Sequence, residues 1–564
     1  MTGPIWQPSE LLAATLLETY RDMFKAALAE GTRRNFILPY DFIPSFFLPI
    51  LYMAIPHTKR PWLYQARWLL LAFIVGFNVQ TMARASSTNL AMSYAAGMYA
   101  FWSIMHNFAL LVWMRPQFEA ERVQRRKRQA LTSTVNMEMS RGDTSGSQIP
   151  QDGSAVRREG QAVGNGVLNG HSGPGLNGST IKENGHTTTQ SEQTAPGANT
   201  AVYEYYWQPF PEHGTFLERL HWSLDLYATF RGAGWNWCVR VIPNPQAPVK
   251  PLSGELVRMD TIPLRTAGGY KTYPTTSAFL RAKLGAILFS ILSLDFLKVL
   301  LMRDLFFIDG GGQSSPLPTH LAALPSWLVP FARHALFLWA LYVAILFFLS
   351  VSDLAGFFAL RYLFPMRDEL WQYSSIFGSL SQVLDRGLAG FWGLWWHQTF
   401  RVPFAGPTGW LLRKGYLAPR TFKVKAAAML FAFFQSGLLH GAGSWSSIPE
   451  TKIWYPMVFF MLSGVGVVVQ SATCAFFKAE FSRLPRAVRR TGNAVYVLLW
   501  LHLTVWPLLK DFTRLGVWLI EPVPVSIFRA MGFGQVENDV WRIDHDTWPH
   551  WVRGKYWWQS GFAL

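Results

Sequence analysis

The sequence has 564 residues, of which half are hydrophobic and only 15% are charged, and its formal net charge is +17. Soluble proteins carry about 25% charged residues, so this composition excludes an ordinary soluble enzyme. The basic residues lie in short loops between apolar blocks, which favours the cytoplasmic loops of a membrane protein over nucleic-acid binding. The two cysteines, Cys238 and Cys474, form no CxxC pair, so we predict neither a disulfide framework nor a metal site.

Apolar blocks long enough to cross a membrane recur along the chain. A helix needs about 20 mostly apolar residues to cross the hydrocarbon core of a bilayer. The predicted spans are residues 37–56, 66–83, 91–114, 284–303, 332–351, 425–441, 453–477 and 493–510. Two further blocks, 355–365 and 515–530, bring the expected total to roughly seven to ten. Because lipid offers no partner to an unpaired backbone group, we expect an all-α, polytopic transmembrane bundle with interfacial helices.

We expect three regions in this chain. Residues 1–114 contain the first spans, and residues 201–564 form the main membrane core. Residues 115–200 begin with the basic run RPQFEAERVQRRKRQ, which acts either as a topology signal or as a contact for anionic lipid. The rest of this region is rich in Gly, Ser, Thr and Asn and has too little apolar surface to offset the entropy of ordering. We predict a long disordered cytosolic loop there.

Several predicted spans contain ionisable residues. Asp295 and Lys298 lie three residues apart on one helical face, and we expect them to form a structural pair. Three histidines in apolar spans have nothing around them that separates a structural from a functional role: His106, His334 and His502.

A further histidine lies in the stretch FFQSGLLHGAGSW. His440 shares a helical face with Ser436 and Gly437, and two small residues beside an imidazole leave room for a substrate or for another backbone. Ionisable residues inside spans often mark functional sites. The alternative for His440 is a hydrogen bond between helices, and its position alone does not decide between the two.

The stretch GFWGLWWHQTFR is too polar and too short for a good span. It surrounds the pair His397 and Gln398 with three tryptophans, Trp392, Trp395 and Trp396. Aromatic residues of this density suit the membrane interface. His397 and Gln398 could donate to an oxyanion or orient an acceptor hydroxyl. The alternative is an ordinary aromatic belt.

Basic residues follow this stretch. Arg401 ends it, and Arg413 and Lys414 lie in the loop that we expect after it. Guanidinium and ammonium groups bind phosphates, so these three side chains could hold a phosphorylated substrate. A positive loop that only orients the protein in the membrane is the alternative.

The order of these motifs resembles a known superfamily. FWGLWWHQTFR followed by SGLLHGAG is similar to the membrane-bound O-acyltransferases, specifically their wax-synthase-like branch. The upstream segment RGAGWNWCVRVIPNP resembles fungal members that acetylate terpenoid and polyketide-derived alcohols. The resemblance covers most of residues 210–510 in motif order. It implies that His440 is the catalytic histidine and that His397 stands where many relatives have asparagine in an FWxxWN motif.

The resemblance also implies a reaction. His440 would act as general base on the hydroxyl of a lipophilic acceptor, which then attacks the thioester of an acyl-CoA, most simply acetyl-CoA. His397 and Gln398 would position the reactants or stabilise the oxyanion, the tryptophans would line an apolar channel, and Arg401 with the loop after it would hold CoA phosphates. We expect no bound cofactor or metal. We expect a multi-pass protein of the endoplasmic reticulum membrane; the acceptor and the oligomeric state are not predicted.

Other activities stay open from the sequence. Within the same superfamily, a long-chain wax-ester or diacylglycerol acyltransferase is the nearest alternative, because acyl-chain length depends on a tunnel that a sequence does not describe. From another class, a polytopic transporter also has polar residues inside spans, although an inverted repeat is not apparent. A scaffolding membrane protein is the third alternative.

Overall fold

The computed structural model describes most of the chain. The described residues are 8–127, 203–246, 252–310, 316–418, 421–534, 540–542 and 545–563. Almost all of the predicted cytosolic loop, from residue 128 to residue 200, therefore lies outside the described residues. The sequence before and after it forms one compact unit, Met1–Arg126 together with Glu204–Leu564.

Six helices in the described residues are long and apolar enough to cross a membrane. They are Pro61–Arg84 (α3, Pro61–Gln65, and α4, Arg67–Arg84), Leu90–Met114 (α5, Leu90–Phe108, and its extension), Thr276–Leu301 (α8), Val329–Tyr362 (α11, Val329–Phe358, and its extension), Phe422–Ser446 (α14) and Trp454–Phe476 (α15). A seventh is the pair α17 (Arg486–Thr504) and α18 (Trp506–Arg514), bent by 45°, if it counts as one span. The predicted all-α polytopic bundle is confirmed, at the lower end of the expected number of spans.

Three predicted spans differ in the structure. Residues 37–56 contain a short strand and the apolar helical stretch Ile43–Ala54, which is too short to cross. Prolines at positions 39, 44 and 49 explain this, because proline lacks the N–H that a continuous helix needs. Residues 515–530 form only short helical turns around Pro522 and Pro524. The block 355–365 is no separate span, since its first part completes α11.

Shorter elements connect the spans. The remaining helices are α1 (Pro8–Ala29), α2 (Leu48–Ala54), α6 (Pro116–Glu119), α7 (Phe216–Ala228), α9 (Leu305–Ile308), α10 (Thr319–Ala322), α12 (Ser381–Gly390), α13 (Arg401–Arg413) and α16 (Lys478–Arg483). The strands are β1 (Arg34–Asn35), β2 (Ile37–Leu38), β3 (Ala85–Ser86), β4 (Arg122–Lys127), β5 (Tyr203–Gln208), β6 (His550–Val552) and β7 (Gly561–Ala563). They pair as β1–β3, β2–β7–β6 and β4–β5.

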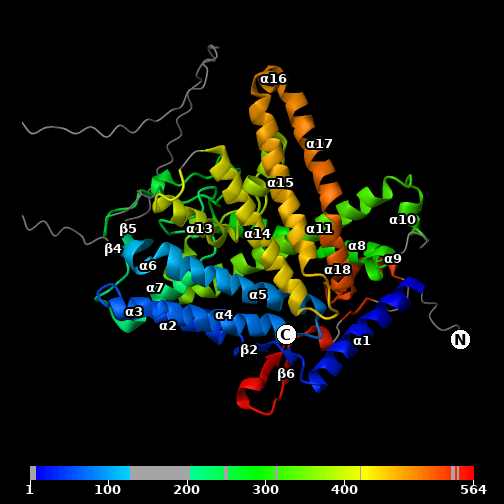
Figure 1. The fold of residues 1–564 in the computed structure, drawn as a ribbon, viewed down its shortest axis with the longest axis horizontal. Helices are drawn as coiled ribbons and strands as arrows, with labels where there is room; N and C mark the ends of the chain where they lie inside the picture. Colours follow the sequence, from blue (N-terminus) through cyan, green and yellow to red (C-terminus); the bar gives the residue numbers. More distant parts are fainter. Residues whose placement is uncertain are drawn as a thin grey trace, which may run out of the picture. The chain divides into compact units, whose positions relative to one another are not determined.

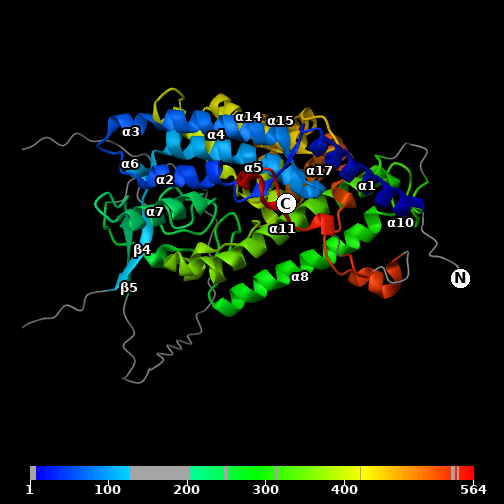
Figure 2. The same cartoon turned by 90° about the horizontal axis from the view of Figure 1, so that it is seen from below.

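Helix α14 connects the N-terminal and C-terminal spans of the bundle. It packs along α15 on one side and along α5 on the other, so the N-terminal and C-terminal spans share one core (Figure 1). Helices α8 and α11 pack along each other and form a second pair, seen clearly in Figure 2. Helices α5 and α14, which are distant in sequence, are thus direct neighbours.

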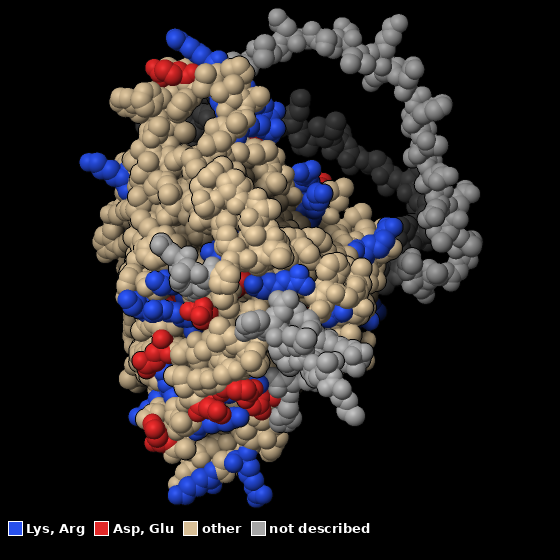
Figure 3. Space-filling view, turned by 90° about the vertical axis from the view of Figure 1, so that its right-hand side faces the viewer, with Lys and Arg blue, Asp and Glu red and all other residues tan. Residues whose placement is uncertain are grey.

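Exposed apolar side chains lie along these helices. Large apolar side chains that are more than half exposed occur on five of them: Leu69, Phe73, Leu288, Phe348, Phe476, Leu498 and Leu503. On the face drawn in Figure 3, most acidic side chains gather in the lower part and a broad area with few charges lies above them. Exposed apolar surface of this extent is what a bilayer covers. The chain is a multi-pass integral membrane protein.

The basic run after α5 makes ion pairs inside the protein. Arg122 of β4 pairs with Asp225 of α7 at 3.2 Å, and Arg125 pairs with Asp368 at 2.9 Å. Arg126 also contacts an acid, Glu204, at 2.5 Å. These contacts join β4 to α7, to Asp368 and to β5, so part of the charge in this run serves the fold.

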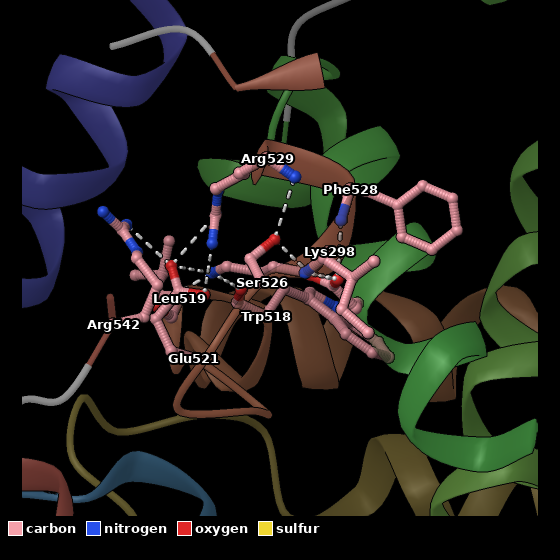
Figure 4. A network of polar contacts seen from close by, with 10 residues as sticks. Lys298, Trp518, Leu519, Glu521, Ser526, Phe528, Arg529 and Arg542 are labelled. Atoms are coloured by element: carbon pink, nitrogen blue, oxygen red, sulfur yellow. Dashed lines mark hydrogen bonds and ion pairs between the residues drawn. The ribbon is translucent and has the colours of Figure 1, made fainter. Parts of the chain in front are cut away.

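A polar cluster joins α8 to the C-terminal segment (Figure 4). Asp295 accepts hydrogen bonds from Ser526 Oγ at 2.5 Å and from the backbone N–H of Ile527 at 2.7 Å. Lys298 donates to the Trp518 carbonyl at 2.6 Å. The predicted pairing of Asp295 with Lys298 is therefore wrong: both residues are structural, but each binds the C-terminal segment, because a buried charge takes the partner that best replaces water.

Glu521 is the acidic centre of the same cluster. Its carboxylate lies 3.0 Å from Arg529, 2.7 Å from Arg542 and 3.8 Å from the Lys298 ammonium. Burial raises the pKa of Glu521, but these three positive charges outweigh burial and lower the pKa to about 2. The cluster is thus a set of matched charges that fixes the C-terminal segment.

Candidate active site

His440 lies in the last third of α14. Its ring stacks on Phe460 of α15, with 4.7 Å between ring centroids and 16° between planes. Its Nδ1 lies 2.9 Å from the hydroxyl oxygen of Tyr94, which comes from α5. Its Nε2 has no hydrogen-bond partner among the residues that the structure describes. One nitrogen of the imidazole thus bonds to Tyr94, and the other has no partner within the described residues.

Small residues around His440 let neighbouring elements approach. A Cβ on Gly437 would lie 2.8 Å from Met457 Cα, so this glycine admits the backbone of α15. A Cβ on Gly443 would lie 2.7 Å from the Tyr94 ring, so this glycine admits the side chain that holds His440. The sequence leaves two uses open for Gly437, room for a substrate or room for another backbone. The structure shows the second, because the backbone of Met457 approaches this glycine. Ser436 is partly exposed, and its hydroxyl has no partner within the described part of the chain.

The WWHQ stretch forms a loop between two helices. A short π-helical turn, Phe391–Trp395, follows α12, and the chain leaves helical geometry at Trp396. Gln398 donates to the carbonyls of Trp392 at 3.2 Å and Trp396 at 2.6 Å, and its Oε1 accepts from Arg401 at 2.6 Å. The Gln398 amide is thus committed to the loop itself, which explains the local order of this segment.

His397 is held at the tip of this loop. Its Nδ1 lies 3.2 Å from Thr399 Oγ1, and its Nε2 has no partner in the described residues. Burial, and after it the positive charges of His440 and Arg231, lower the pKa of His397 to about 3. The two imidazoles are therefore within electrostatic range of each other, and His397 is neutral at physiological pH. The pairing of His397 with His440 in one site stays a prediction from the motif order.

The three tryptophans of the WWHQ stretch pack against different neighbours. Trp392 packs edge-on against Phe433 at 5.6 Å and lies 6.0 Å from Phe460, the ring that stacks on His440. Its Nε1 is buried and has no partner among the described residues. Trp395 stacks on Tyr342 at 5.8 Å, whereas Trp396 stacks on Phe391 at 5.6 Å. Trp392 alone of the three makes an aromatic contact with the ring beneath His440.

Trp395 forms part of the wall of a cavity. This open cavity of about 520 Å³ lies between α8 and α11, and its wall includes Phe377, whose ring also contacts His397 at 6.4 Å. A buried ammonium, that of Lys283, lines it and pairs with Asp353 at 2.5 Å. Ser350 also lines it, and its buried hydroxyl has no partner in the described part of the chain. The cavity is mostly apolar, carries balanced charge and adjoins His397.

The predicted phosphate-binding residues are separate from the histidines. Arg401 donates to the Gly393 carbonyl at 2.8 Å and to Gln398, so it supports the loop. Arg413 donates to the Trp113 carbonyl at the end of α13, and Lys414 beside it is exposed. Within the described residues neither Arg413 nor Lys414 bonds to His397 or His440.

Two residues near His440 are not predicted from the sequence. Tyr94 belongs to a span with no distinctive motif. Asp511 of α18 is completely buried, and its Oδ2 accepts from Ser444 Oγ at 2.7 Å. Asp511 closely follows the apolar residues 506–509, and an acid in this position is a signal of function that the sequence contains. Tyr94 has no such signal in the sequence. No cluster of three or more potential metal ligands occurs among the described residues.

Comparisons with known proteins point to one family. Residues 373–462 match the model of the membrane bound O-acyl transferase family. The chain is similar to an O-mevalon transferase of Aspergillus niger, at 27% identity over 55% of this chain and 63% of that protein. It is also similar to an acetyltransferase of Aspergillus fumigatus, at 27% identity over 26% of this chain and 24% of that protein. An acetyltransferase of Aspergillus nanangensis is 24% identical over 28% of this chain and 38% of that protein.

The matched regions span less than two thirds of each of these relatives. No solved structure matches the chain significantly. The family match contains His397, His440 and Phe460, and it ends before Asp511. These matches confirm the resemblance in the motifs: the chain is similar to membrane-bound O-acyltransferases and, among them, to fungal transferases.

Proposed function

We propose that this protein transfers an acyl group, most simply acetyl, from acyl-CoA to the hydroxyl of a lipophilic acceptor such as a terpenoid or polyketide-derived metabolite. The observation that carries the proposal is the pair of histidines, each with one nitrogen held by the protein and Nε2 open. Two relatives named acetyltransferases support acetyl as the group.

His440 acts as the general base in this proposal. Its Nε2 takes the proton of the acceptor hydroxyl as the acceptor oxygen forms a bond to the thioester carbonyl carbon. The carbon–sulfur bond of the tetrahedral intermediate then breaks, and the CoA sulfur leaves as thiolate. The thiolate takes up the proton that the His440 imidazolium received from the acceptor hydroxyl. Protons and charge balance without a covalent acyl-enzyme.

His397 stabilises the oxyanion. When Thr399 Oγ1 donates to Nδ1, the proton of His397 resides on Nε2 and points to the site as a donor. A pKa of about 3 keeps this imidazole neutral, so it replaces the neutral amide of the asparagine that many relatives have. The indole N–H of Trp392, buried and without a partner in the described residues, is a second donor for the same region.

Other predicted residues take supporting roles. Gln398 and Arg401 hold the loop that presents His397, because their polar atoms bond within that loop. Arg413 and Lys414, exposed at the end of α13, are the residues that we assign to the CoA phosphates. We assign the apolar body of the acceptor to the cavity beside Trp395, and we expect the reaction to take place at the endoplasmic reticulum membrane.

One assay tests the proposal. Membranes that carry the protein are incubated with labelled acetyl-CoA or palmitoyl-CoA, alone and in competition, and with a panel of lipophilic alcohols. We expect labelled acetyl ester with the wild type and none above background with His440→Ala. A strong preference for palmitoyl-CoA would replace the acetyl assignment by a long-chain one. No ester from either donor with any alcohol would favour transport instead.

A further inference from the structure

The hydrogen bond between His440 and Tyr94 decides what Nε2 can do. Either Tyr94 Oη donates to Nδ1, or Nδ1–H donates to Tyr94 Oη, over the same distance of 2.9 Å. In the first arrangement the imidazole proton lies on Nε2, which is then a donor and no base. In the second the proton lies on Nδ1, and Nε2 carries the lone pair. A general base at Nε2 needs the second arrangement.

A buried carboxylate, that of Asp511, acts on Tyr94 through its charge. Asp511 is 0% exposed, and the hydroxyls of Ser444 and Thr451 lie at its carboxylate. The carboxylate is within electrostatic range of the Tyr94 hydroxyl, and Phe512, its neighbour in the chain, packs edge-on against the Tyr94 ring at 5.1 Å.

We propose that Tyr94 and Asp511 form a relay that keeps His440 in the tautomer with its proton on Nδ1. The field of the carboxylate orients the Tyr94 O–H dipole toward Asp511. The lone pair of Tyr94 Oη then faces Nδ1–H of His440, and the Nε2 lone pair faces the acceptor hydroxyl. This inference rests on the general-base role proposed above for His440.

The relay also acts during the reaction. When Nε2 accepts the proton of the acceptor hydroxyl, the imidazole becomes a cation, and the nearby carboxylate offsets its charge. Tyr94 and Asp511 keep their own protonation states throughout, so the only proton that moves is the one between the acceptor oxygen, Nε2 and the leaving sulfur. Tyr94 and Asp511 touch no substrate and are positioning residues.

One turn of α14 builds this arrangement. The absent side chain of Gly443 makes the space that the Tyr94 ring fills. Ser444 donates to Asp511 Oδ2 at 2.7 Å and so fixes the carboxylate relative to the helix that carries His440. The relay therefore joins three helices, α5, α14 and α18, at the HGAGS part of the motif.

Kinetics of single and double variants test the relay. Tyr94→Phe and Asp511→Asn keep the shape of the side chains and remove the hydroxyl or the charge. We expect each to lower kcat at least about tenfold with both KM values within about threefold of wild type. The double variant should be within about threefold of the poorer single variant, because both act through one path. Ser463→Ala, which removes another buried hydroxyl without a partner in the described residues, is the matched control and should keep wild-type kcat.

An unchanged kcat in Asp511→Asn, or a double variant whose loss equals the product of the two single losses, would overturn the relay. Folding is checked for each variant by size-exclusion chromatography in detergent, and kcat is expressed per folded molecule. A double variant that fails this check leaves the two single variants and the labelling below as the test.

A second measurement does not depend on activity. Diethyl pyrocarbonate acylates an unprotonated imidazole nitrogen, and peptide mass spectrometry gives the labelling rate of each histidine. The relay predicts several-fold slower labelling of His440 in Asp511→Asn than in the wild type, because Tyr94 is then free to donate to Nδ1, with no change at His502. Equal rates at His440 would contradict the relay. Slower labelling in a protein that transfers no acyl group would support the relay and refute the proposed function.

Discussion

Two buried polar regions of this molecule differ in how their polar groups are paired. In the cluster between α8 and the C-terminal segment, Lys298, Glu521 and Arg529 each face a group of opposite charge. Around His440, the Nε2 of His440 accepts or donates no hydrogen bond within the described residues, and the buried Trp392 Nε1 has no partner there. The first region matches its buried charges, although the buried Trp518 Nε1 has no partner among the described residues. The second region contains the atoms that the proposed reaction uses.

The largest effect on stability is expected in the paired region. Glu521→Ala removes the carboxylate that Arg529, Arg542 and Lys298 share and leaves buried cations unpaired. Loss of one partner of a buried pair costs about 3–5 kcal/mol. We expect a clearly lower unfolding temperature in detergent, with unchanged activity per folded molecule. A loss of kcat in the folded fraction would mean that the two regions are not separate.

The same group gives a pH dependence with a definite sign. The folded-state pKa of Glu521 is about 2, below its usual value of 4.5, so its stabilising effect is present above about pH 4.5 and is lost as the pH falls toward 2. We expect the difference in unfolding temperature between the wild type and Glu521→Gln to shrink between pH 5 and pH 3. A difference that stays constant over this range would contradict the assignment of these charges.

A methyl group added at Gly443 tests the region around His440. Gly443→Ala places a Cβ against the Tyr94 ring and should displace the hydroxyl that holds His440. We expect kcat to fall about tenfold or more. The control is Gly76→Ala in α4, where a Cβ meets nothing within 4 Å and helix propensity favours alanine. Equal activity of the two variants would show that the position of Tyr94 does not matter.

Filling the cavity between α8 and α11 should raise the KM for the acceptor alcohol and leave that for acetyl-CoA nearly unchanged. Ala286→Trp places a large ring into the space between α8 and α11. We expect the KM for the acceptor alcohol to rise about tenfold while the KM for acetyl-CoA changes less than about twofold. Leu288→Trp on the exposed face of the same helix is the control. A rise in the KM for acetyl-CoA instead would assign the cavity to the acyl donor.

The smallest effect is expected at His397. His397→Asn restores the residue of many relatives, and both side chains are neutral, because the pKa of His397 is about 3. We expect kcat within about threefold of wild type and pH–rate profiles of the same shape between pH 6 and pH 9. A profile that loses one limb in the variant would show that His397 titrates in this range.

The helical class and most spans could be predicted from the sequence, because apolar length is a local property. The importance of His397 and His440 stays a prediction from the motif order. Prediction from the sequence failed at residues 37–56, where prolines break an apolar block, and at Asp295, whose partner lies in the C-terminal segment. It also missed Tyr94, which is 346 positions from His440 in the chain. Contacts between distant helices depend on packing, and packing is set by small residues such as Gly443 whose partners a single sequence does not name.

The central claim is that His440 is the general base of an acyl transfer. The direct measurement is the rate of acetyl ester formation by purified protein in detergent, for the wild type, His440→Ala and His502→Ala. His502 is the matched control, a histidine in an apolar helix that bonds to another histidine, His334, at 2.9 Å. General-base catalysis contributes a factor of about 10²–10⁴, so we predict a loss of that size in His440→Ala and a rate within about threefold of wild type in His502→Ala. Equal rates for the wild type and His440→Ala would contradict the claim.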